Sequence, residues 1–263
     1  MSYETIRFSV EDGVGHIVLA RPKQANTVNR VFTAEFGDAV QKCKDDSNVR
    51  AVLLSAEEGP IFSAGGDLGT FAKSGDQLPQ DMAAMIEEFH SPIQTLTEMD
   101  APLIVAVNGV AAGAGFSLVL TASMVIASEK ASFSMAYTGA GLTPDGSSTY
   151  FLPKIVGLRR AEELMLTNRQ LSAQEALEWG IINQLVDETE LLEKAMKTAK
   201  RLAKGPSKAF GTVRKLLLSG YDCALPVQLQ REGESIVEMT KADDGKEGIA
   251  AFLEKRRPAF KGQ

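Results

Sequence analysis

The stretch "LIVAVNGVAAGAGFSLVL" (residues 103–120) carries the pattern that decides the fold. Its first five residues are all apolar, which is typical of a strand that is buried on both faces. A loop rich in Gly and Ala follows, and then comes a short apolar segment, "FSLVLTA" (116–122), that we expect to be helical. This order of strand, glycine-rich loop and helix predicts one unit of an α/β fold.

The same order recurs along the chain at intervals of about 50 residues, as in folds built from repeated units. An earlier buried strand, "VRAVLLS" (49–55), leads to the loop "FSAGGDL" (62–68) and then to an apolar helical pattern. A later pass begins with "MVIAS" (124–128) and "ASFSM" (131–135) and ends in a helix near residues 161–167. The recurrence predicts a wound α/β core with spiral character.

Both ends of the chain differ from this repeat. Residues 3–10 and 14–20 predict two strands joined by a turn, and a helix follows with Asn26 or Thr27 as its N-cap. Ser172 and Glu175 fit a capping box at the start of another helix. From about residue 188 onward the strand signals vanish and only helical patterns remain. We therefore predict an α/β core over residues 1–195 and a C-terminal helical region over residues 196–263.

Composition excludes several classes of function. The 263 residues are 44% hydrophobic with a formal net charge of −6, which is ordinary for a globular protein and unfavourable for binding nucleic acid or anionic membranes. No apolar run reaches the roughly 18 residues that would span a bilayer. The N-terminus alternates polar and apolar residues, unlike a targeting segment, so we expect a cytoplasmic protein with no nucleic-acid or membrane partner.

Cysteines and histidines are few and scattered. Cys43 and Cys223 lack CxxC spacing, which favours free, reduced thiols. His16 and His90 are isolated, and without an HxH or HExxH motif we expect no metal site. His16 lies in a strand pattern and His90 in a helical one, so both are interpreted as structural.

The two glycine-rich loops are candidates for a chemical role. Each loop lies between a strand and a helix, and its small residues let a ligand approach the backbone closely. Two such loops side by side could direct two backbone N–H groups at one oxygen, forming an oxyanion hole with Ala64 and Ala114 as donors. Tight strand-to-helix packing explains the same glycines.

One acidic residue, Asp145, stands alone in "GAGLTPDGSSTYFLP" (139–153). Asp between Pro and Gly commonly stabilises a turn through its own side chain. A lone carboxylate in an apolar, glycine-lined pocket is also suited to moving a proton. Both interpretations are open at this point.

Together these segments resemble the crotonase, or enoyl-CoA hydratase/isomerase, family. The similarity covers "LARPKQANTVN" (19–29), both glycine loops, the region from "ASFSM" through "INQLV" (131–186) and the tail "FLEKRRPAF" (252–260). It implies an α/β spiral of ββα repeats with a C-terminal helical region used in assembly. It also implies acyl-CoA thioester substrates, homotrimers or hexamers formed as dimers of trimers, and no cofactor, since coenzyme A is part of the substrate.

The resemblance assigns roles to particular positions. Ala64 and Ala114 match the two oxyanion-hole donors, and Asp145 matches the single acid of isomerases that shift a double bond. Ser117 and Tyr137 stand where the hydratases of the family carry two glutamates. The positions that it implies near the acyl-CoA are Ala25, Ala64, Gly65, Gly66, Asp67, Leu68, Ala114, Tyr137 and Lys255.

These matches favour an enoyl-CoA isomerase that uses Asp145 as a proton shuttle. "PDGSSTYFLP" (144–153) is similar to the same segment in Δ3,Δ2-enoyl-CoA isomerases and in the ring-epoxide isomerases of phenylacetyl-CoA degradation. The alternatives are a hydratase or another lyase, a dehalogenase with Asp145 as nucleophile, and a non-catalytic relative that binds RNA or CoA. The dehalogenases place a Trp-His pair where this chain has Tyr137 and Thr138. The helical residues expected to shape an acyl pocket are Phe71, Met82, Met85 and Phe89.

Overall fold

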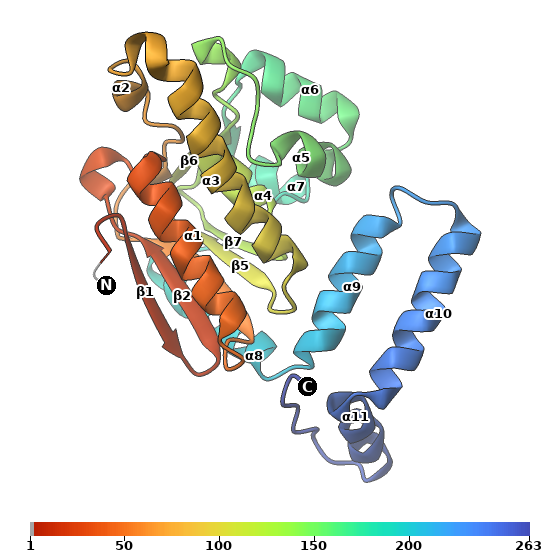
Figure 1. Ribbon diagram of the computed structural model, residues 1–263. Helices are drawn as coiled ribbons and strands as arrows, with labels where there is room; N and C mark the ends of the chain where they lie inside the picture. Colours follow the sequence, from red (N-terminus) through yellow and green to blue (C-terminus); the bar gives the residue numbers. More distant parts are fainter. Residues whose placement is uncertain (1–2) are drawn as a thin grey trace.

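A computed structural model describes residues 3–263, and Figure 1 shows two stacked sheets with helices around them and a helical arm at the C-terminus. The strands are β1 (Ile6–Glu11), β2 (Val14–Leu19), β3 (Ala51–Ala56), β4 (Ile61–Ser63), β5 (Leu103–Val107), β6 (Val110–Ala112), β7 (Met124–Ser128), β8 (Ser132–Ser134), β9 (Leu171–Ser172) and β10 (Gln184–Val186). The helices of the core are α1 (Arg30–Asp45), α2 (Leu68–Phe71), α3 (Leu78–Glu98), α4 (Ala114–Leu120), α5 (Ser148–Val156), α6 (Leu158–Thr167), α7 (Ala173–Glu178) and α8 (Leu191–Ala203). The arm consists of α9 (Ser207–Ser219), α10 (Leu225–Lys241) and α11 (Asp243–Leu253).

The two sheets explain the predicted spiral. The large sheet has the order β1-β2-β3-β5-β7-β10, and the small sheet has the order β4-β6-β8-β9. Each turn of the chain adds one strand to each sheet, as β3 and β4, β5 and β6, and β7 and β8, before the next helical segment. Apart from the β1–β2 hairpin and the β8–β9 pair, neighbouring strands are parallel. The predicted spiral of ββα repeats is therefore confirmed.

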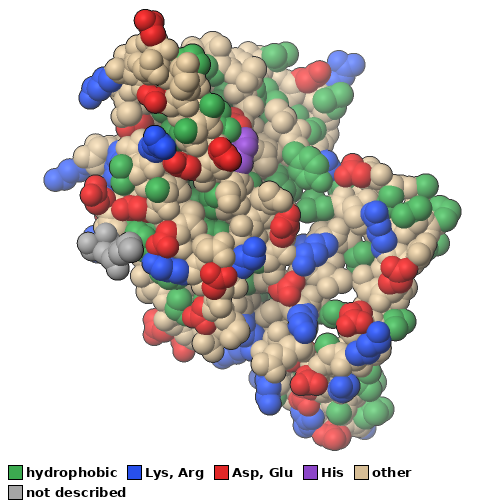
Figure 2. Space-filling model, in the orientation of Figure 1, with side chains coloured by type: hydrophobic (Ala, Val, Ile, Leu, Met, Phe, Trp, Pro, Cys, Tyr) green, Lys and Arg blue, Asp and Glu red, His purple; other side chains and the backbone are tan. Residues whose placement is uncertain are grey.

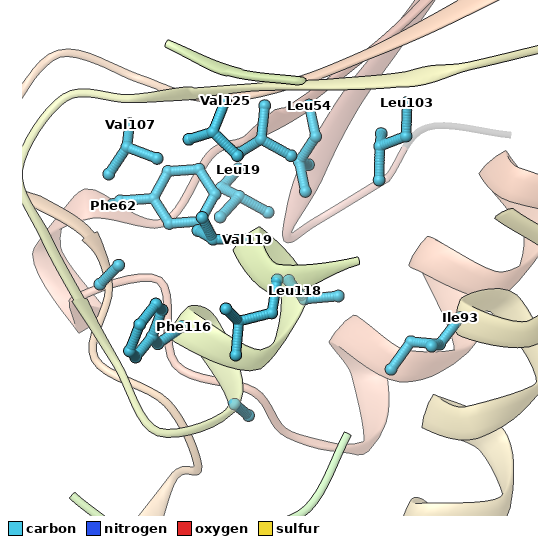
Figure 3. Close-up of a cluster of buried hydrophobic side chains, with 14 of the residues drawn as sticks. Leu19, Leu54, Phe62, Ile93, Leu103, Val107, Phe116, Leu118, Val119 and Val125 are labelled. Carbon is cyan, nitrogen blue, oxygen red and sulfur yellow. The ribbon is translucent and has the colours of Figure 1, made fainter. Parts of the chain in front are cut away.

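The core lies between the sheets and the helices that cover them. Figure 3 shows Phe62 of the small sheet, Phe116 and Val119 of α4, and Leu54 of the large sheet in one cluster. The Phe62 and Phe116 side chains are fully buried. On the other face of the large sheet, α8 packs its alanines against β3 and β5. Because β3 and β5 are covered on both faces, β5 is apolar throughout and β3 is apolar apart from Ser55, as their sequences predicted.

The N-termini of two helices, α7 and α1, test the capping residues predicted from the sequence. The capping box of α7 is formed by Ser172 and Glu175 as predicted. The N-cap of α1 is Asn29, so the prediction of Asn26 or Thr27 is wrong. The Asn26 side chain is instead buried, where it accepts a hydrogen bond from the Arg21 N–H and donates one to the Phe62 carbonyl.

The C-terminal arm contrasts with this packed core. The predicted domain boundary at 195/196 falls inside α8, which packs against the large sheet, and the helices beyond it form the arm. Figure 2 shows hydrophobic side chains on the surface of the arm. Helix α10 has no buried residue, and its exposed apolar side chains are Leu225, Val227, Leu229, Ile236 and Val237. This apolar surface has no partner within the described chain.

A partly buried side chain, Arg214, helps to hold the arm against the core. The guanidinium of Arg214, in α9, donates hydrogen bonds to the backbone carbonyls at the end of α3 and just beyond it. Its distances are 2.6 Å to Leu96 O, 3.3 Å to Thr97 O, 3.0 Å to Met99 O and 3.2 Å to Ala101 O. Burial lowers the pKa of Arg214. These carbonyls are the groups that a helix C-terminus leaves without intrahelical partners, so Arg214 serves as their cap.

Candidate active site

A cavity of about 330 Å³ opens where the two glycine loops, α2, α3 and residues 136–145 meet. Its wall is mostly apolar, and the predicted residues Phe71, Met82, Met85 and Phe89 all line it. Ala64, Gly66, Leu68, Ala114, Tyr137 and Asp145 also line it. An apolar hollow with a few converging polar groups is the usual form of a small-molecule site. Sequence reasoning therefore selected most of the residues that the fold brings together here.

The two glycine loops touch each other at Gly65. Its φ of +89° lies in the left-handed region that favours glycine. A Cβ at this position would lie 2.8 Å from the Ala112 carbonyl oxygen and 3.2 Å from the Ala114 nitrogen. Only glycine allows this approach, so the loop over 62–68 is held directly against the start of α4. The prediction that the loops lie side by side is confirmed.

The hydrogen bonds of the loops correct the choice of one donor. The N–H of Ala64 donates to the Ala25 carbonyl at 2.9 Å, so it is already engaged and is a poor oxyanion donor. The next N–H, that of Gly65, reaches the Ser63 hydroxyl at 3.3 Å. Within residues 3–263, the N–H groups of Gly66 and Ala114 have no hydrogen-bond acceptor, and both residues line the cavity. The available pair is thus Gly66 and Ala114, in which Gly66 takes the place of Ala64, two positions earlier, in the pair expected from the sequence.

The Asp145 carboxylate has a partner that the sequence analysis missed. Its Oδ1 lies 2.7 Å from Nε2 of His90, which projects from α3. The side chains are 31% and 49% exposed, respectively, so the pair lies between the cavity and solvent. The interpretation of His90 as structural did not foresee this contact and stays a prediction, whereas His16 is largely buried and lies 2.9 Å from the Ser55 hydroxyl, as expected of a structural histidine.

The backbone of Asp145 is fixed by hydroxyl groups. Its carbonyl accepts hydrogen bonds from Ser117 Oγ at 2.8 Å, Ser148 Oγ at 2.9 Å and Tyr137 OH at 3.3 Å. Ser117 Oγ and Tyr137 OH are 2.9 Å apart. Burial raises the pKa of Tyr137 to about 12, so its phenol stays neutral at physiological pH. The backbone of Asp145 is thereby held in place, and its carboxylate lines the cavity.

Ser117 and Tyr137, the positions at which hydratases are expected to carry glutamates, are therefore part of a hydroxyl network. Ser117 is fully buried and also donates to the Gly113 carbonyl. Neither side chain is an acid or a base at neutral pH. Asp145 is the carboxylate that lines the cavity.

The residues predicted to contact coenzyme A are only partly gathered here. Asp67 caps α2 by accepting from the Thr70 N–H, and it also accepts a hydrogen bond from Thr27. Ala25, in a left-handed turn, supplies the carbonyl that holds Ala64. Neither Ala25 nor Lys255 lines the cavity, and Lys255 is an exposed residue just after α11.

Other kinds of site find no support in the described part of the chain. Residues 3–263 contain no group of three or more His, Cys, Asp or Glu side chains that could hold a metal ion. Over the same residues, no helix has the length and apolar character that crossing a bilayer requires. The polar groups of the residues that line the cavity include the backbone N–H groups of Gly66 and Ala114, the Tyr137 hydroxyl and the Asp145 carboxylate.

Comparison with known proteins agrees with this geometry. Residues 9–263 match the family profile described as enoyl-CoA hydratase/isomerase. The chain belongs to that family. It is 37% identical over the full length of both chains to a protein of Rhodobacter capsulatus described as "Probable enoyl-CoA hydratase". It is 36% identical, over 99% of both chains, to 1,2-epoxyphenylacetyl-CoA isomerase of Escherichia coli.

The fold of this family member agrees as well. The crystal structure of an enoyl-CoA hydratase/isomerase from Cupriavidus metallidurans superposes with a TM-score of 0.90 at 31% identity, covering 100% of this chain and 98% of the other. The chain therefore has the crotonase fold and is an acyl-CoA enzyme of this family. Relatives at this level of identity include both hydratases and isomerases, so the reaction must be argued from the site itself.

Proposed function

We propose that this enzyme moves a double bond in an enoyl-CoA thioester. Asp145 removes a proton from C2 of a 3-enoyl-CoA, and the electrons flow into the thioester oxygen to form an enolate. The N–H groups of Gly66 and Ala114 stabilise that oxygen, since each such donor typically contributes about 3–4 kcal/mol. Asp145 then delivers a proton to C4, and the double bond comes to lie between C2 and C3.

The observation that carries this proposal is the hydroxyl network around Asp145. Hydration needs one group to orient and activate water and another to protonate the neighbouring carbon. Ser117 and Tyr137 bond to each other and to the Asp145 carbonyl, which leaves one carboxylate at the cavity. A 1,3-proton shift needs only one base that accepts and returns a proton, and the site supports that requirement.

Assembly is part of the proposal. We propose that the arm of α9, α10 and α11 forms subunit contacts in a homotrimer or a dimer of trimers. Exposed apolar side chains such as Leu229 and Ile236 support this, because a surface of that kind is usually covered by a partner. Ala25, the loop over 64–68 and Lys255 are proposed to contact the CoA portion, with Lys255 reaching a phosphate of CoA bound to a neighbouring subunit.

The test uses Asp145→Asn, which keeps the size and turn-forming ability of the side chain but removes the base. A positioned general base contributes roughly 10²- to 10⁴-fold, so kcat for 3-hexenoyl-CoA is expected to fall by that factor. Asp81→Asn is the matched control, since Asp81 is an exposed residue of α3 that does not line the cavity. Circular dichroism checks that both variants fold.

Mass spectrometry of the product separates isomerisation from hydration. The isomerase predicts 2-hexenoyl-CoA with the mass of the substrate, and its formation should be lost in Asp145→Asn but not in Asp81→Asn. A product heavier by one water, formed at full rate by Asp145→Asn, would refute the proposal and leave Asp145 as a turn residue.

Nucleophilic substitution is a second candidate because of one observation, the contact between His90 and Asp145. In that reaction Asp145 attacks a ring carbon and expels halide, and His90 then activates the water that hydrolyses the resulting ester. Incubation with 4-chlorobenzoyl-CoA tests it directly. Chloride release that is lost in Asp145→Asn would establish this reaction, and absence of chloride would exclude it for this substrate.

A further inference from the structure

His90 lies between two hollows of the molecule. Its ring contacts Asp145, which lines the cavity, and it also lines a separate groove of about 410 Å³ between α3, α5 and α9. We infer that His90 positions Asp145 and exchanges its proton with solvent through this groove during turnover. This inference rests on the proposed isomerase function and assigns a further residue to it.

The packing of α3 holds the ring in this place. Phe89 and Ile93 are buried, so the turn of helix that carries His90 is anchored on both sides of it in sequence. Gly146, at φ +60°, lets the Asp145 segment approach α3, because a Cβ there would lie 2.9 Å from the Phe89 ring. The packing of α3 and of the Asp145 segment thus holds His90 and Asp145 close enough for the 2.7 Å contact.

The two sides of Asp145 differ in their access to water. The cavity wall is largely apolar, and an acyl chain that fills it would cover that side of the carboxylate. The His90 side chain, in contrast, is 49% exposed. With substrate bound, the route from the carboxylate to solvent therefore passes through the imidazole.

One hydroxyl of a residue that lines the groove has no partner among the described residues. Ser147 lines it, and its Oγ is buried with no hydrogen-bond partner in the described protein. Buried polar atoms are nearly always hydrogen-bonded, and an ordered water is the usual partner where no protein group is available.

The proton balance of the exchange is simple. Asp145 takes a proton from C2 and becomes a neutral acid, which transfers this proton to Nε2 of His90. The imidazolium then gives this Nε2 proton to a water molecule at the exposed edge of the ring and takes a solvent-derived proton back onto Nε2. It then returns a solvent-derived proton to Asp145, which delivers it to C4. No bond other than these N–H, O–H and C–H bonds forms or breaks.

The experiment follows the proton in D₂O. Wild type, His90→Gln and the control Gln94→Ala convert 3-hexenoyl-CoA at low conversion, and mass spectrometry gives the fraction of 2-hexenoyl-CoA that carries deuterium at C4. Gln can still donate a hydrogen bond to the carboxylate but cannot relay a proton. We expect substantial deuterium with wild type and Gln94→Ala and a several-fold smaller fraction with His90→Gln, with little change in KM.

A second measurement separates relay from positioning. His90→Ala removes both roles, and added imidazole should restore deuterium entry into the product, since it can enter the space that the ring vacates. A purely structural histidine would show no such rescue. Equal deuterium fractions in wild type and His90→Gln, or full retention of the substrate proton by wild type, would overturn the inference while leaving the isomerase intact. Failure of wild type to form 2-hexenoyl-CoA would instead overturn the proposed function itself.

Discussion

The two walls of the cavity are built on different principles. One wall, formed by residues 62–68 and 108–118, offers backbone N–H groups, and its lining residues are Gly or Ala apart from Leu68. The opposite wall, formed by residues 137–145 and α3, offers the Asp145 carboxylate and the Tyr137 hydroxyl, and His90 contacts that carboxylate from outside the cavity. The role proposed for the first wall depends on where its backbone lies, whereas the role proposed for the second depends on which side chains it carries.

This difference explains how each wall responds to substitution. A backbone donor survives any side-chain change that leaves the loop in place, and it fails when the N–H is removed or the loops are pushed apart. A side-chain network fails when one polar atom is deleted, even if the fold is unchanged. The predictions below are designed to separate these two kinds of failure.

The largest effect is expected from Ala114→Pro on the backbone wall. Proline removes the N–H, yet it is well accepted at the first position of a helix, which Ala114 occupies in α4. Loss of one oxyanion donor typically lowers kcat by about 10²- to 10³-fold. Ala114→Gly, which keeps the N–H, is the control and should stay near wild type. Normal turnover by a folded Ala114→Pro enzyme would remove Ala114 from the proposed oxyanion hole.

The next effect comes from separating the two loops. Gly65→Ala places a Cβ against Ala112 and Ala114 and strains a positive φ, so we expect a loss of at least about 1–3 kcal/mol of stability together with lower kcat. Gly141→Ala is the matched control, since its φ is +71° but no atom lies within 4 Å of the added Cβ. Urea denaturation measures the stability of the two variants, and steady-state assays measure their kcat. If the two variants behaved alike, the close contact of the loops would not matter.

A smaller effect is expected from Tyr137→Phe on the side-chain wall. It removes the hydrogen bond with Ser117 and the longer one to the Asp145 carbonyl, each of which typically contributes about 0.5–1.5 kcal/mol, and leaves that carbonyl held by two serines. We expect a several-fold loss in kcat with little change in fold. Ser148→Ala should act in the same direction, and an unchanged kcat in both variants would show that the carbonyl needs no such anchor.

The same residue gives a pH prediction. The folded pKa of Tyr137 is raised from an ordinary value of 10 to about 12 by burial, so its proton is bound more tightly in the folded state. The associated stability is present below pH 10 and is lost as the pH rises from 10 towards 12. Tyr137→Phe should lose less stability than wild type over that window. Parallel loss in both proteins, measured by urea denaturation at several pH values, would contradict the assignment.

The smallest effect is expected from a substitution of Lys255, which lies outside both walls of the cavity. Lys255→Ala should raise KM for the full CoA thioester but not for a pantetheine analogue that lacks the nucleotide, provided that the enzyme is assembled. Arg256 is a poorer candidate because its guanidinium is paired with Glu247 and Glu254. Equal changes for both substrates would point to an effect on assembly instead.

How much the sequence predicted depends on the range of the interactions. The repeated strands and glycine loops are local patterns, and the spiral follows from them. The choice between Ala64 and Gly66 depends on whether an N–H is already bonded to Ala25, a contact that no local pattern encodes. The pairing of His90 with Asp145 joins residues 55 positions apart, so an isolated helical histidine carried no signal of it. Asn29 was missed as N-cap because Asn26 and Thr27, which precede it by three and two residues, could also begin α1.

The cap that Arg214 places on α3 bears on how this protein can be recombined with its relatives. The arm supplies one guanidinium, and the core supplies the carbonyls of Leu96, Thr97, Met99 and Ala101. A chimera that takes α9–α11 from another family member therefore has to bring an arginine at this position or accept an uncapped α3. Since α3 also carries His90, which contacts Asp145, a change at the join between the two segments would also disturb the position of the Asp145 carboxylate.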